Sequence, residues 1–177
     1  KLSSTGPQVL SYATEMSRSG LLAGTNAARA ANNLGPLVLN SQLNTSAQSK
    51  AQHMADNDYW SHDAPDGTQP WFFFEQAGYS YTRAGENLAY GFMTSQSTVD
   101  GWMASPGHKA NILGDYVDVG FGIVNVPSYQ GSGEETIVVA HYGSQGGSAP
   151  ALMQDLPSTQ PQQPVSNPSS MPATPTT

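Results

Sequence analysis

Two segments late in this sequence, residues 117–126 and 136–142, carry apolar side chains on both faces of an extended chain. Strands with this pattern are typical of a sheet that other elements cover on both sides. Segments with helical spacing or helix start signals precede them, at 21–32, from 41 or 44 to 58, 70–78, 94–104 and 105–113. Helices followed by strands predict an α+β fold, a three-layer α/β/α sandwich with a mainly antiparallel central sheet.

Local signals sharpen this prediction at two places. Ser105 followed by Pro106 is a specific start signal, in which the serine caps a helix and the proline occupies its first turn. Gly120 and Gly122 lie in the first strand, where the missing side chains allow another element to approach closely.

A change of composition near Gly143 predicts the domain boundary. Residues 157–177 hold six prolines and no charged residue. Such a segment cannot bury enough apolar surface to offset its ordering entropy. We therefore expect an N-terminal extension at 1–20, one domain at 21–143, and a Gly/Pro/Ser-rich linker or disordered tail at 144–177. The tail is interpreted either as an extended stalk or as an ordinary disordered end.

Charge and cysteine content exclude several classes of protein. The net charge is −7 and the six basic residues are scattered, whereas nucleic-acid binding needs clustered positive charge. No apolar run approaches the roughly 20 residues that span a bilayer, so no transmembrane segment is expected in this sequence. There is no cysteine, so His and carboxylate side chains are the only candidate metal ligands.

The four histidines differ in their surroundings. His53 lies away from the apolar face of its helix and is expected to be solvated. His62 lies where a helix breaks into a turn, a place where side chains can point into a cleft. His108 lies in a first helical turn and shares a face with Ile112, so we expect it to point inward. His141 alternates with apolar strand residues, which indicates a core or cleft-lining histidine with a satisfied hydrogen bond.

Glu86 is a carboxylate among aromatic and small residues, with no basic residue closer than Arg83. If Glu86 is buried it needs a partner, because an unpaired buried charge is very costly. A histidine is the natural partner, since the carboxylate would fix its tautomer and leave the other nitrogen free. The alternative is a glutamate that accepts backbone N–H groups and braces a loop.

Several blocks together resemble bacterial domains of the CAP superfamily, which contains cysteine-rich secretory proteins, antigen 5 and pathogenesis-related proteins. The resemblance implies an α/β/α sandwich and an extracellular or cell-surface location. The matching blocks occur in the family's order and are 25–29 with 35–37, 85–89, 102–113, 119–122 and 141–143.

The resemblance also implies a cleft with two histidines and two glutamates, which in some members holds a divalent cation. His62, Glu86 and His108 match three of these positions. The second glutamate would fall at 104–105, where Ser105 is expected to line the cleft and cap its helix. His62 and His108 are the candidate metal ligands, for zinc or for magnesium or calcium, because two imidazoles and a carboxylate fit a zinc site with an open position.

Three functions follow from this reading. We favour a monomeric binding module whose cleft contacts a lipid, a glycan or a surface protein. The alternative is a metal-dependent hydrolase, with Glu86 as support or as general base for a bound water. The third is a structural surface domain with a vestigial cleft.

Overall fold

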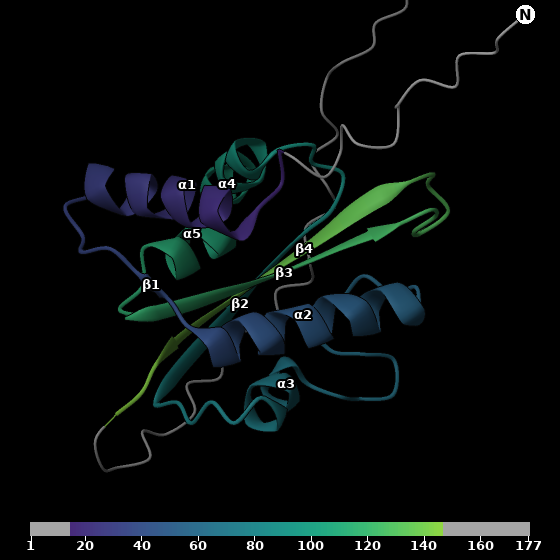
Figure 1. Cartoon of the computed structure of the whole chain (residues 1–177), viewed down its shortest axis with the longest axis horizontal. Helices are drawn as coiled ribbons and strands as arrows, with labels where there is room; N and C mark the ends of the chain where they lie inside the picture. The colour runs from purple at the N-terminus through teal and green to yellow at the C-terminus, as the bar shows by residue number, and fades with distance from the viewer. Residues whose placement is uncertain (1–14, 147–177) are drawn as a thin grey trace, which may run out of the picture.

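The computed structural model describes residues 15–146, which form five helices and four strands (Figure 1). The helices are α1 Arg18–Ala31, α2 Ser41–Asp56, α3 Pro70–Gln76, α4 Ser95–Ala104 and α5 Pro106–Ile112. The strands are β1 Val38–Leu39, β2 Arg83–Ala89, β3 Asp118–Val126 and β4 Glu135–Ser144.

The strands form one sheet in the order β1-β3-β4-β2. The short β1 runs parallel to β3, and the β3–β4 and β4–β2 pairs are antiparallel. Helices α1, α4 and α5 lie on one face of this sheet, and α2 and α3 lie on the other (Figure 1). The predicted three-layer α/β/α arrangement with a mainly antiparallel sheet is therefore confirmed.

Strand β4 divides the core into two halves because alternate side chains point to opposite faces. Val138, Ala140 and Tyr142 pack in one cluster with residues of α1, α4 and α5. Ile137 and Val139 pack in a second cluster with residues of α2. His141 follows these two at the same spacing, so its side chain faces α2.

Two glycines of β3 set the distance between the sheet and α2. A Cβ at Gly120 would lie 2.1 Å from the backbone carbon of Leu43, and one at Gly122 would lie 2.1 Å from the carbonyl oxygen of Ala47. The backbone of α2 thus rests directly on the strand, as the sequence predicted. This close approach brings polar side chains of α2 to the face of β4 that carries His141.

The sequence reading placed only two strands and left 83–89 unassigned. The structure makes this segment β2, which carries Glu86 and is buried from Gly85 onward. Sequence reasoning missed it because glycine, glutamate and asparagine are depleted in strands. Helix α1 also begins at Arg18 rather than at residue 21, because Ser17 caps it by accepting a hydrogen bond from the N–H of Gly20 at 3.0 Å.

The predicted linker or tail at 144–177 lies almost wholly outside the described residues, as does most of the predicted extension at 1–20. Between residues 15 and 146, none of the helices combines the length and the apolar character that crossing a membrane requires.

Candidate functional site

Glu86 lies at the centre of the site and bridges two histidines. The register of β2 and β4 places it directly opposite His141. Its Oε2 lies 2.8 Å from Nε2 of His141, and its Oε1 lies 2.7 Å from Nδ1 of His62. The glutamate side chain is only 2% exposed. The sequence predicted that a buried Glu86 would pair with a histidine, and the structure provides two such partners.

The hydrogen bonds keep this buried carboxylate ionised. Burial by itself raises the pKa of Glu86, but the hydrogen bonds from His141 and His62 and the charge of Lys50 outweigh it and lower the pKa to about 2. An ionised carboxylate only accepts hydrogen bonds. The proton in each bond therefore belongs to the imidazole, which fixes a ring tautomer for both histidines.

His141 is fully buried, and both of its ring nitrogens are satisfied. Burial lowers its pKa, with Glu86 acting in the opposite direction, so the ring is neutral and donates from Nε2. Its Nδ1 then accepts from the hydroxyl of Ser46 at 2.7 Å. Phe74 stacks on the ring with a centroid distance of 4.3 Å. The structure thus confirms the predicted core histidine with satisfied hydrogen bonds.

His62 is the accessible partner of Glu86. It follows the end of α2, and its side chain is 30% exposed. Because Nδ1–H donates to Glu86, the hydrogen bond leaves Nε2 as the second ring nitrogen of His62, turned away from the carboxylate. This nitrogen is available to a hydrogen-bond donor or to a cation.

His108 lies on α5, four residues before the fully buried Ile112. Burial, followed by the nearby charge of His62, lowers the pKa of His108 to about 4. The ring is therefore neutral at physiological pH.

Asn87 holds His108 next to the strand that carries Glu86. Its Nδ2 donates to the carbonyl of His108 at 3.0 Å. The side chain of Asn111 donates to Oδ1 of Asn87 at 2.8 Å and to the carbonyl of Glu86 at 3.0 Å. Neighbouring residues of β2 therefore fix both halves of the site, Glu86 through the histidines and Asn87 through α5.

Comparison with known proteins identifies the family of this chain. The model of the Cysteine-rich secretory protein family, CAP, matches residues 22–142. This chain belongs to the CAP family. The protein YkwD of Bacillus subtilis, itself described as uncharacterized, is 40% identical over 101 residues, which are 56% of this chain and 39% of YkwD. The chain thus spans well under half the length of this relative.

Solved structures of other bacterial proteins share the fold. An extracellular protein containing an SCP domain from Bacillus anthracis superimposes with a TM-score of 0.63 at 24% identity, covering 72% of this chain and 40% of that protein. An outer surface protein from Borrelia burgdorferi gives a TM-score of 0.58 at 22% identity, covering 71% of this chain and 90% of that one. These likenesses support the fold and do not by themselves assign an activity.

The start signal at Ser105 and Pro106 is confirmed, but two details predicted for individual residues of this CAP domain are wrong. Ser105 is the N-cap residue of α5, but its hydroxyl makes no capping hydrogen bond, and only its carbonyl accepts from the N–H of Lys109 at 2.8 Å. His53 is half-buried rather than solvated. Its Nδ1 lies 3.0 Å from the hydroxyl of Tyr59, and its ring packs edge-on against Tyr59 and Phe73.

The donor atoms of the site do not complete a protein metal centre. Within residues 15–146, no group of three or more His, Asp or Glu side chains is arranged to hold a metal ion. Both oxygens of Glu86 are already hydrogen-bonded, so the protein offers the imidazoles of His62 and His108. A catalytic zinc ion usually has three protein ligands. The geometry therefore does not fit the zinc site expected for a hydrolase.

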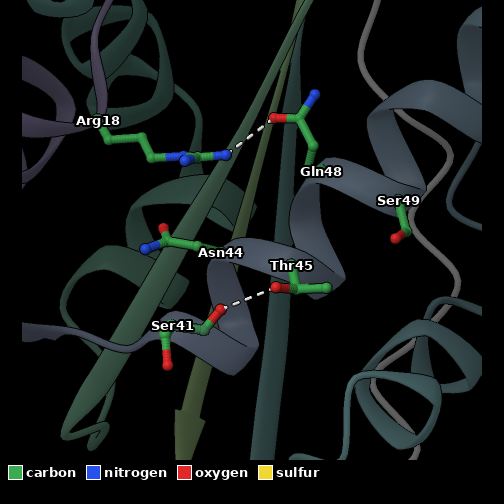
Figure 2. A pocket seen from close by; sticks show the side chains of 6 residues that line it. All are labelled: Arg18, Ser41, Asn44, Thr45, Gln48 and Ser49. Carbon is green, nitrogen blue, oxygen red and sulfur yellow. Dashed lines mark hydrogen bonds between the residues drawn. The ribbon is translucent and has the colours of Figure 1, made fainter.

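A separate groove lies beside the more exposed side of α2 (Figure 2). The guanidinium of Arg18 is held there by Gln48 Oε1 at 3.0 Å and by the carbonyl of Phe121 at 2.7 Å. The lining residues are all polar and include no His, Asp or Glu: Arg18, Ser41, Asn44, Thr45, Gln48 and Ser49. The groove thus lacks the residue types on which the candidate site depends.

Proposed function

We propose that this CAP domain acts outside the cell as a binding module and that its ligand contacts His62 and His108. The carrying observation is the hydrogen bond from Nδ1 of His62 to the buried Glu86, which orients a partly exposed imidazole and leaves its Nε2 free. The neutral ring of His108 supplies a second polar contact nearby. The extracellular and outer-surface relatives support the location.

The chemistry of the site favours a ligand rich in hydroxyl groups. A neutral imidazole nitrogen accepts a hydrogen bond from a hydroxyl, and aromatic rings offer flat apolar faces to sugars. Trp60 and Tyr90 are both partly exposed and pack edge-on with a centroid distance of 4.8 Å, and Trp60 lies two residues before His62. A cell-envelope glycan therefore suits these residues better than a lipid or a surface protein.

The proposal includes a divalent cation at His62 and His108 whose remaining coordination positions are not filled by the protein. The two imidazoles would hold the ion, and water or the glycan would supply the other donor atoms. When bound, such an ion would polarise the ligand oxygens that contact it. The hydrolase alternative is less well supported, because no third protein ligand joins the pair among the described residues.

Calorimetric titration with soluble cell-wall glycan fragments tests the proposal. We expect wild-type protein to bind, and His108→Ala to weaken binding by about fivefold, since one lost hydrogen bond is worth about 1 kcal/mol. Lys109→Ala is the matched control, because Lys109 is exposed on the same short helix. Equal affinities of the two variants would exclude His108 from the ligand site.

Titration of the same proteins with zinc, magnesium and calcium distinguishes direct contact between the glycan and the imidazoles from contact through a bound cation. Stoichiometric binding that is lost in His108→Ala would place a cation between the histidines. If no cation binds and the glycan still does, the ligand contacts the imidazoles directly.

A further inference from the structure

Lys50 is the least expected residue near the site. It lies on α2 and is 0% exposed, although lysine is almost never fully buried unless its charge is paired. Sequence reasoning did not single it out, because one lysine within a helix carries no signal of burial. A fully buried ammonium needs acceptors for its three protons and a compensating negative charge.

The structure supplies three acceptors, all in the segment that follows α2. Nζ of Lys50 donates to the hydroxyl of Tyr59 and to the carbonyl of Ser61, both at 3.1 Å, and to the carbonyl of His62. The rings of Tyr59 and Phe73 lie 4.9 Å and 5.7 Å from Nζ. One ammonium group therefore binds the turn from Tyr59 to His62 to the buried face of α2.

The compensating charge is Glu86. Burial lowers the pKa of Lys50, and the charge of Glu86 is the strongest influence that raises it. The direct partners of Glu86 are the two histidines, so Lys50 acts on it through space. Glu86 and Lys50 thus place one negative and one positive group in the interior of the site.

The position of Lys50 on α2 connects it with the other histidine. Ser46 lies one turn earlier on the same helix, and residues four apart share a face. Ser46 binds the ring of His141, and Lys50 binds the backbone of His62. Helix α2 thus contacts both partners of Glu86 from one face.

We propose that Lys50 is the positioning residue of this site: its ammonium group fixes the backbone at Ser61 and His62, so that Nδ1 of His62 meets Glu86, and supplies the buried positive charge that balances that carboxylate. This inference deepens the proposed function, because it says what orients the accessible imidazole. Its test does not depend on any ligand, so its failure is distinguishable from the failure of glycan binding.

The absence of cysteine in the chain permits a matched chemical test. Lys50→Cys introduces a single thiol, which is alkylated in the denatured chain and then refolded. Bromoethylamine restores a side chain of lysine length that ends in an ammonium group. Iodoacetamide gives a neutral amide of similar size. The two products share one mutation and one refolding history and differ in charge.

The readout is the ring nitrogen chemical shifts of His62 and His141 at neutral pH. We expect the aminoethylated protein to show the wild-type pattern, with the proton of His62 on Nδ1 and that of His141 on Nε2. The neutral product should lose the Nδ1–H tautomer of His62 and keep the His141 pattern, because Ser46 still holds that ring. A wild-type His62 signal in the neutral product would overturn the proposal.

A measurement on the wild-type protein decides the matter if the neutral product does not fold. We expect the amino protons of Lys50 to exchange slowly with water, because three oxygens hold them in the interior. Lys109 is the internal control, since it is exposed on α5. Exchange at Lys50 as fast as at Lys109 would overturn the proposal without any variant.

Discussion

Glu86→Gln tests the electrostatic account of the site most directly. The substitution keeps the size of the side chain and removes its charge. The amide has one acceptor oxygen for two imidazole donors, and its NH2 group faces a nitrogen that already carries a proton. It also leaves the ammonium group of Lys50 buried without a counter-charge. Removal of one partner from a buried charge pair costs about 3–5 kcal/mol of stability.

The pKa of Glu86 gives an independent value for how much the ionised carboxylate contributes to the stability of the wild-type protein. Its pKa falls from 4.5 to about 2 on folding. A difference of about two and a half pH units, at 1.36 kcal/mol each, amounts to about 3 kcal/mol. The folded pKa is the lower one, so this stabilisation is present above pH 4.5 and is lost as the pH falls toward about 2. The variant cannot lose it, because glutamine does not titrate.

The assay is urea unfolding, followed by tryptophan fluorescence, at a series of pH values from neutral to about 2. We expect Glu86→Gln to be about 3 kcal/mol or more less stable than wild type at neutral pH, with the gap closing as the pH falls below 4.5. Glu75→Gln is the control, because Glu75 is exposed on α3. Parallel stability profiles for Glu86→Gln and wild type would refute the ionised, histidine-bound carboxylate.

Other parts of the fold yield further tests. Gly120→Ala should lower the free energy of unfolding by about 1–3 kcal/mol or more, because the added Cβ would collide with the backbone of α2. Gly133→Ala is the control and should not change thermal stability, because an added Cβ there would have no atom within 4 Å beyond its chain neighbours. Ser46→Ala should cost about 1–3 kcal/mol in the same assay by leaving Nδ1 of His141 unpaired. His108→Gln should flatten the stability profile between pH 6.5 and about 4, because the unfolded wild-type histidine takes up its proton first as the pH falls. An unchanged slope over that interval would contradict the buried, neutral His108.

The sequence predicted the layers of this CAP domain because periodicity reports which faces are buried. Helical spacing and start signals identified all five helices, and the two segments that are apolar on both faces became β3 and β4. The sequence analysis missed strand β2 because its central residues are small or polar. These residues are buried for their hydrogen bonds, and a pattern of apolar residues cannot report that kind of burial.

The sequence predicted the histidines and the glutamate of the site better than the polar residues that hydrogen-bond to them. His62, Glu86 and His141 meet as a hydrogen-bonded group, and His108 lies on α5, which the side chains of Asn87 and Asn111 hold against β2. Ser46 and the other polar residues that satisfy these groups were missed, since each lies at an ordinary helix or strand position. Long-range register decides which polar residues meet. His141 faces Glu86 only because β4 pairs with β2 in one register of several.

The outer edge of β2 determines where α5, and with it His108, lies relative to Glu86. A strand at the edge of a sheet presents unpaired carbonyl groups that invite pairing with another chain. In β2 these groups accept from side chains instead: Ala84 from Tyr116 at 3.3 Å, Glu86 from Asn111 at 3.0 Å, and Leu88 from the indole of Trp102 at 2.9 Å.

The same contacts dock α4 and α5 against the edge of β2 and so place His108 beside the strand whose Glu86 orients His62. A change that shifted β2 would therefore move both imidazoles at once. The ligand proposed above would therefore meet two imidazoles that the fold already holds in position, and it would not have to order them.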